Sequence, residues 1–206
     1  MVAVSLMFSV SSAQELKSIK LPDPQIDGGR PLMQALKDRK TSREFSGTEL
    51  PLQTLSNILW AGFGINRPES GRRTAPSAVN RQEIDIYVAG EDGLFLYDEK
   101  KNTLEQVVAQ DLRADTGTQS FVKDAPINLV YVADLSKMGS GTDAQKERTA
   151  WADTGFISQN VYLYCASEGL ATVVRGLVDR DALAPKMKLR PDQRITLTQT
   201  VGYPKQ

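Results

Sequence analysis

Apolar residues recur every three or four positions in three parts of the chain, which predicts three helices. Pro31 opens a short helix, and Pro51 stands at a favourable first position of a second one. A much longer helix is predicted over residues 143–169. The apolar residues of these three faces are, in order, Leu32, Ala35 and Leu36; Leu52, Leu55, Ile58, Leu59 and Phe63; and Ile157, Val161, Tyr164 and Cys165. Gly155 and Ala166 lie on other faces of the long helix, where small side chains would let a second helix approach.

Other segments predict strands. Residues 84–89 and 94–98 flank Glu91-Asp92-Gly93, which indicates a hairpin with glycine at a position that needs positive φ. Residues 127–133 are apolar on both faces, which indicates a central strand, and residues 194–201 alternate as a last strand. We find no internal repeat or low-complexity tract.

Composition narrows the possible functions. The 206 residues fit one domain, and 25 Lys plus Arg balance 25 Asp plus Glu, so nothing favours nucleic acid or an anionic membrane as a partner. Because the chain has no histidine, a Ser-His-Asp triad and imidazole metal ligation are excluded, and no metal site is expected. Cys165 is the only cysteine, which excludes an intrachain disulfide, and its helical surroundings favour a buried small hydrophobe over a reactive thiol.

The N-terminus divides into two segments before the domain. Residues 1–13 are apolar and end in Ser11-Ser12-Ala13, which is typical of a signal peptide, although no Lys or Arg precedes the apolar run. We expect a secreted or periplasmic protein, with a structural N-terminal strand and a cytoplasmic location as the alternative. Residues 14–30 are predicted to form an extended arm, and residues 31–206 a single domain. No apolar run approaches the ~20 residues that a membrane span needs.

The candidate chemistry begins with Arg39-Lys40-Thr41-Ser42-Arg43, which places three cations and two hydroxyls in five residues. A phosphomonoester binds to such forked cations and hydroxyl donors, although cations at a helix end are also common without a ligand. Downstream, a Pro-Ser-Ala-Val-Asn turn at residues 76–80 leads into the alternating residues 83–88. Two later segments are Leu170 to Gly176 and Thr196 to Pro204.

In this order and spacing, the four segments resemble the FMN-dependent nitroreductase family from about Arg30 to the end of the chain. The resemblance implies an α+β fold with a central, mainly antiparallel sheet flanked by helices, in an intertwined homodimer with two FMN sites. It also implies roles for individual residues. Arg39, Lys40 and Thr41 would hold the phosphate and ribityl chain, and Arg43 would stabilise the reduced ring.

The resemblance assigns the remaining contacts to three further segments. Pro76, Ser77, Ala78 and Asn80 would reach the flavin of the partner subunit. Backbone groups of Val174, Arg175 and Gly176 would lie along the ring and donate to N5, the hydride acceptor, while Arg175 would direct its side chain to a donor or substrate. Lys205 is expected to complete the phosphate site. Every group is a cofactor ligand, so no separate catalytic acid or base is predicted.

Within the family, the chain is most similar to the azoline-oxidising dehydrogenases of azole-forming peptide maturation. That similarity lies in Arg73 to Ala78, Leu94 to Asp98 and Leu104-Glu105. Arg72-Arg73 is interpreted as a surface charge pair, with a patch that binds phosphate or an acidic substrate as the alternative. We expect ping-pong transfer from a donor such as NAD(P)H to a nitroaromatic or quinone. The alternatives are flavin-dependent oxidation of an azoline-like substrate and a flavin-binding redox carrier or sensor without turnover.

Overall fold

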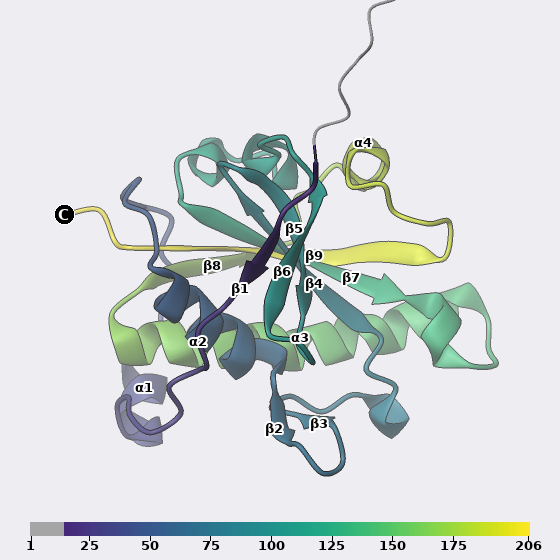
Figure 1. The fold of residues 1–206 in the computed structure, drawn as a ribbon, viewed down its shortest axis with the longest axis horizontal. Helices are drawn as coiled ribbons and strands as arrows, with labels where there is room; N and C mark the ends of the chain where they lie inside the picture. The colour runs from purple at the N-terminus through teal and green to yellow at the C-terminus, as the bar shows by residue number, and fades with distance from the viewer. Residues whose placement is uncertain (1–14) are drawn as a thin grey trace, which may run out of the picture.

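The computed structural model describes residues 15–206, and its central feature is an antiparallel sheet of seven strands (Figure 1). The strands follow the order β1-β6-β5-β4-β7-β9-β8, and every neighbouring pair is antiparallel. Their bounds are β1 Ser18–Lys20, β4 Ile84–Gly90, β5 Gly93–Asp98, β6 Thr103–Val108, β7 Ile127–Asp134, β8 Ala171–Arg175 and β9 Gln193–Gly202. A separate two-stranded ribbon joins β2 Ile65–Arg67 to β3 Arg72–Arg73. The predicted signal peptide, residues 1–13, lies outside the described residues.

Helices cover both faces of this sheet. The helices are α1 Leu32–Asp38, α2 Leu52–Phe63, α3 Asp143–Glu168 and α4 Arg180–Lys186, with short 3-10 turns η1 Ala78–Asn80, η2 Arg113–Thr116, η3 Ser120–Lys123 and η4 Leu135–Met138. One core cluster packs α2 and α3 against the sheet, and a second packs α4 against the opposite face. Figure 1 shows α3 crossing the molecule below the sheet, with α1 beside its C-terminal end. The fold is therefore α+β with a central antiparallel sheet, as the sequence predicted.

Alternation along β4 explains how one strand serves both cores. Ile86 and Val88 belong to the cluster with α2 and α3, whereas Tyr87 and Ala89 belong to the cluster with α4. All eight residues of β7 are buried, which confirms the predicted interior strand. The β4–β5 hairpin is confirmed as well, with Gly93 at φ 135°.

The long helix α3 has a clear signal at each end. Thr142 and Gln145 form a capping box at its start, and Gly169 ends it in the left-handed conformation with φ 72°. Ile157, Val161 and Cys165 are fully buried, as the predicted stripe requires. Pro51 differs slightly from its prediction, because it precedes α2 as the N-cap instead of standing inside it.

The short helix α1 buries less than its pattern suggests. Ala35 is buried, but Leu32, Met33 and Leu36 are 62%, 76% and 44% exposed. On α3, Trp151 and Phe156 are 40% and 49% exposed. Large apolar side chains on two helices that contact each other thus remain uncovered in the single chain.

Candidate functional site

The basic cluster at residues 39–43 lies along the free edge of β8. Arg39 ends α1 with extended dihedral angles (φ −56°, ψ 120°), and Ser42 N donates to the Thr172 carbonyl at 3.0 Å. Farther along, Phe45 forms a β-bridge with Pro204. The segment therefore runs beside the end of the sheet, and consecutive side chains alternate between two sides.

One side of the segment is organised by Tyr162 of α3. Its hydroxyl accepts a hydrogen bond from Val174 N at 2.9 Å and lies 3.0 Å from Thr41 Oγ1. The Arg39 guanidinium stands 5.4 Å from the centre of the Tyr162 ring, within the range of a cation–π interaction. The structure thus brings together Arg39, Thr41 and Val174, which are far apart in the sequence. We call residues 39–43, Tyr162 and β8 the edge region.

Alternate residues of the segment line a pocket of about 610 Å³, which Tyr162 also borders. Lys40, Ser42 and Glu44 contribute alternate side chains, and Lys205 and Arg30 add two cations. Lys205 is brought here by the bond from its own N–H to the Glu44 carbonyl, 3.3 Å. Lys40 and Ser42 thus line this pocket together with Lys205, whereas Arg39 and Thr41 contact Tyr162 directly; alternation assigns the exposed Arg43 to the second group. This arrangement separates Lys40 from the residues grouped with it in the sequence prediction.

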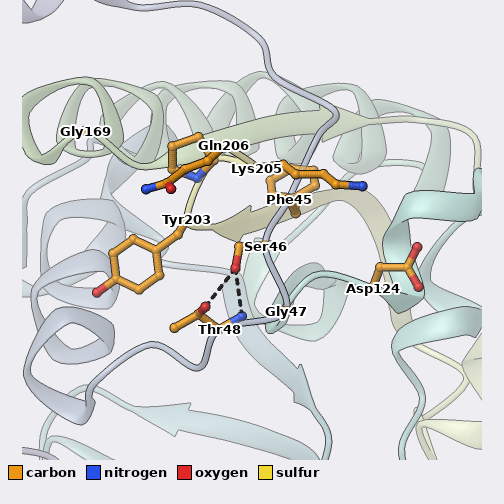
Figure 2. A pocket seen from close by; sticks show the side chains of 10 residues that line it. Phe45, Ser46, Gly47, Thr48, Asp124, Gly169, Tyr203, Lys205 and Gln206 are labelled. Carbon is orange, nitrogen blue, oxygen red and sulfur yellow. Dashed lines mark hydrogen bonds between the residues drawn. The ribbon is translucent and has the colours of Figure 1, made fainter.

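A second pocket adjoins the first one, with Gly169, Pro204 and Lys205 lining both. It measures about 910 Å³ and is lined mainly by residues 45–48 and 203–206, as Figure 2 shows. Its hydroxyls bond to each other, Ser46 Oγ to Thr48 Oγ1 at 2.7 Å. Because only Lys205 of the predicted site residues lines it, we place the candidate site at the edge region instead.

The Arg175 side chain does not point toward the free edge of β8. The prediction that it would meet a donor or substrate is therefore wrong. Its guanidinium is 3% exposed and donates to the Thr116 carbonyl and to Asn128 Oδ1, both at 2.9 Å. Burial lowers the pKa of this guanidinium to about 10. The Arg175 side chain therefore fastens η2 and β7 to β8, and only the backbone of this residue remains near the site.

The backbone of β8 is divided between β9 and the free edge. The Thr172 carbonyl and the Val174 N–H both point away from β9, toward Ser42 and Tyr162. Because neighbouring residues of a strand alternate in this respect, Arg175 N–H faces β9, and the strand ends at this residue. Gly176 directly follows β8 and is exposed, so its N–H is a candidate donor to a ligand at this edge.

The turn at residues 76–80 has an unusual backbone. Val79, Asn80 and Gln82 all have positive φ, at 55°, 54° and 51°, and Val79 is 86% exposed. A β-branched residue in the left-handed region is a true outlier, and such strain clusters at functional sites. The turn is held by Ala78 N, which donates to Asp153 Oδ2 of α3 at 2.8 Å, and by Gln82 N, which donates to Ser77 Oγ at 2.9 Å.

Two buried carboxyl groups stand behind this turn. Glu83 is fully buried, Asp153 is 4% exposed, and neither oxygen of Glu83 has a hydrogen-bond partner in the described residues. Burial, together with the Asp153 carboxyl group, raises the pKa of Glu83 from 4.5 to about 7, against opposing contributions from the backbone of Glu83 and from Arg81. Sequence reasoning missed this pair. We call residues 76–83 and Asp153 the turn region.

A single chain does not bring the two regions together. Asp153 and Tyr162 both belong to α3, but their positions differ by about 14 Å along the helix axis and by about two and a half turns, which places them on opposite sides. Pro76, Ser77, Ala78 and Asn80 are therefore separated from Arg39, Thr41 and Val174 within this chain.

Several motif residues hold the fold instead of forming a site. Arg73 was interpreted as a surface charge, but it is 7% exposed, forms an ion pair with Glu99 and donates to the Phe63 carbonyl at 3.1 Å. Asp98 Oδ1 accepts from Lys100 N and Lys101 N, both at 3.0 Å, and so closes the β5–β6 turn. These elements of the azoline-dehydrogenase resemblance thus have structural roles here.

Three properties of residues 15–206 concern thiol chemistry, metal binding and membrane insertion. Cys165 is fully buried, and burial raises the pKa of its thiol, as expected for a small core residue. Among residues 15–206, no group of three or more Cys, Asp or Glu side chains is arranged to hold a metal ion. None of the helices in that range has the length and apolar content of a membrane span.

Comparison with known proteins gives consistent matches. The model of the nitroreductase family matches residues 36–203. A nitroreductase of Methanocaldococcus jannaschii is 29% identical over 186 residues, which cover 85% of this chain and 88% of the relative. A crystal structure of a nitroreductase from Ralstonia eutropha superposes with a TM-score of 0.87 at 44% identity, covering 92% of this chain and 90% of the other. A Desulfovibrio desulfuricans structure in complex with FMN has a TM-score of 0.63 at 22% identity, covering 87% and 89% of the two chains.

Proposed function

Because the chain belongs to the nitroreductase family of flavin-dependent oxidoreductases, we propose that it binds FMN at the edge region. In this proposal it transfers hydride from NAD(P)H to a nitroaromatic, a quinone or a similar small acceptor by a ping-pong mechanism. The observation that carries the proposal is the assembly of Arg39, Thr41 and Val174 around the Tyr162 hydroxyl. It joins a cationic, hydroxyl-bearing segment to a strand edge with a candidate backbone donor.

The chemistry of this segment fits the tail of FMN. A phosphomonoester carries nearly two negative charges and three acceptor oxygens, so it favours guanidinium groups and hydroxyl donors. Arg39 supplies the guanidinium group, and the exposed Thr41 supplies the hydroxyl donor. Lys40 and Lys205, which line the adjacent pocket, would add positive potential without contacting the phosphate directly. The residues present therefore fit the dianion.

The strand edge fits the ring. When bound, the isoalloxazine supplies the hydride chemistry, and the protein supplies orientation and electrostatics. Since Tyr162 occupies Val174 N–H and β9 faces Arg175 N–H, Gly176 N–H becomes the proposed donor to N5. Arg43 would lie near the pyrimidine edge of the ring, where a guanidinium stabilises the charge gained on reduction. The chain contains no histidine imidazole, so proton transfer would use carboxylates, Tyr, Lys, water held by Arg, or the cofactor itself.

The turn region would complete the site of a second copy. Pro76, Ser77, Ala78 and Asn80 lie too far from the edge region of their own chain to contact one ligand with it. Uncovered apolar residues on the α1 and α3 surfaces offer a contact area for a partner, namely Leu32, Met33, Leu36, Trp151 and Phe156. We therefore infer a homodimer in which each flavin lies between one edge region and the partner's turn region.

The decisive experiment is to purify the protein, load it with FMN and remove free flavin by dialysis. We expect a yellow dimer that oxidises NADPH in steady state with nitrofurazone or a quinone, with parallel double-reciprocal plots. A colourless protein without affinity for FMN would refute the proposal. Bound FMN without NAD(P)H turnover would refute the reductase assignment alone.

If FMN binds but NAD(P)H is not oxidised, further reactions distinguish the two alternative functions inferred from the sequence. Flavin reduction by an azoline-containing peptide would favour a substrate-oxidising dehydrogenase. Photoreduction without reoxidation by any quinone or nitro compound would favour a redox carrier or sensor.

A further inference from the structure

The Tyr162 hydroxyl has a defined hydrogen-bond direction. An amide N–H can only donate, so the phenol oxygen must accept from Val174 N at 2.9 Å. Its single proton then remains available for Thr41 Oγ1, 3.0 Å away. If it donates there, the proton of Thr41 is free to point outward, because the threonine oxygen already accepts one bond.

The opposite direction is less suitable for an anion. If Thr41 donated to Tyr162, the threonine would present only lone pairs to a ligand, and a phosphate oxygen beside it would be repelled. A phenol is also more acidic than an aliphatic alcohol, so it is the better donor of the two. A negative ligand next to Thr41 thus selects the order Val174 N–H to Tyr162 O–H to Thr41 O–H, in which each bond polarises the next.

We propose that Tyr162 is a positioning residue, which orients the Thr41 hydroxyl as a donor to the phosphate of FMN. This inference rests on the proposed function. The ring of Tyr162 adds a second effect, since Arg39 stacks over it at 5.4 Å and is held on the same side as Thr41. One side chain of α3 would thereby set both the guanidinium and the hydroxyl that meet the phosphate.

The test is a double-mutant cycle with Tyr162→Phe and Thr41→Val, two changes that nearly preserve shape. Tyr162→Phe keeps the ring under Arg39, so it isolates the hydroxyl. FMN and riboflavin, which lacks the phosphate, are titrated into each apoprotein by flavin fluorescence quenching. We expect each single variant to weaken FMN binding about tenfold and the double variant to weaken it no further, because both changes remove the same donor. Riboflavin affinity should change less than about twofold.

Tyr164→Phe is the matched control, two residues away on α3, where the hydroxyl interacts with Asn57. It should leave FMN affinity within about twofold of the wild type. Thermal unfolding of each apoprotein shows whether the variants fold, and Thr41→Val is at an exposed position that tolerates the change.

Each outcome addresses a separate statement. Wild-type protein that fails to bind FMN would refute the proposed function. Wild-type binding that Tyr162→Phe leaves intact would refute only the role of Tyr162. Equal losses for FMN and riboflavin, or additive losses in the cycle, would mean that Tyr162 merely supports the fold of β8.

Discussion

The edge region and the turn region are both anchored on α3, but they are held in opposite ways. In the edge region, polar groups pair with one another at ordinary distances, as Tyr162 does with Thr41 and Val174. In the turn region, three residues other than glycine have positive φ, and the buried Glu83 carboxyl group has no hydrogen-bond partner among residues 15–206. One region is relaxed and the other stores conformational and electrostatic energy.

This difference agrees with their proposed roles. A segment that binds the cofactor of its own chain is stabilised by contacts already present in the monomer. A segment that must fit a second chain is shaped in advance by the fold, and Asp153 fixes it through Ala78 N. The strain is thus concentrated in the part that would meet a partner.

The largest expected effect is the loss of FMN binding when the cations of the edge region are removed. Replacing Arg39 and Arg43 together by Ala should weaken FMN binding about a thousandfold, because two charge-assisted interactions with the ligand are lost. Flavin absorbance after dialysis measures it. Exposed Arg72 and Lys100, replaced together by Ala, form the control with equal charge change. Retained flavin in the first variant would contradict the site assignment.

The next effect concerns Arg175. Its substitution tests whether the side chain stabilises the fold while only the backbone of β8 serves the flavin site. Arg175→Ala should lower the unfolding free energy by about 3 kcal/mol, because it leaves a cavity and removes two buried hydrogen bonds. Urea unfolding measures it. Arg190→Ala removes a side chain that is 54% exposed and pairs with Asp134, so it should cost less than about 1 kcal/mol. A stable Arg175→Ala variant with weak flavin binding would instead return this side chain to the site.

A smaller effect tests the energy stored in the turn region. The folded-state pKa of Glu83, about 7, lies above its usual value of 4.5, so the folded protein binds more protons than the unfolded chain between these values. Stability should therefore fall as pH rises from about 4.5 to 7 and stay lower above that range. Glu83→Gln removes this titration, so its stability relative to wild type should increase by about 2 kcal/mol from pH 5 to pH 8.

Urea unfolding at the two pH values provides this measurement. Glu69→Gln, at an exposed loop position, should show the same stability relative to wild type at both. Identical pH profiles for wild type and Glu83→Gln would mean that Glu83 is ionised at no cost.

The smallest effect relieves backbone strain. Val79→Asn should stabilise the protein by about 1 kcal/mol, since Asn tolerates the left-handed conformation and the exposed Val79 has little packing to lose. Thermal unfolding measures the change. Val107→Asn, at a half-buried strand position of β6, should have the opposite sign. Destabilisation at Val79 would show that the turn is not strained.

Hydrophobic periodicity predicted most of the fold because the elements concerned are long or strongly patterned. It identified α1, α2, α3, β4, β5, β7 and β9. It missed β6 because buried Gln106 interrupts the apolar pattern, and this side chain binds backbone groups of Lys17 and Asp92. It also missed the short strands β1 and β8 and the helix α4, whose pairing and packing depend on distant residues.

The site could be predicted only in part. The cations of residues 39–43 are local in sequence, so their composition was visible, but their division between two sides follows from the extended backbone. Tyr162 was missed because its partner Thr41 is 121 positions away. The conformation of Val79 contradicts the preference of a β-branched residue, and sequence patterns express preferences rather than exceptions to them.

The shared anchor of the two regions has a mechanical consequence. A continuous 26-residue helix is stiff along its axis, so a displacement at Asp153 is transmitted to Tyr162 instead of being absorbed between them. In the proposed homodimer, each flavin site would contain the edge region of one chain and the turn region of the other, so both α3 helices would contribute to it. Binding of FMN at one site should consequently alter the FMN affinity of the other site, so that the two sites would bind FMN cooperatively.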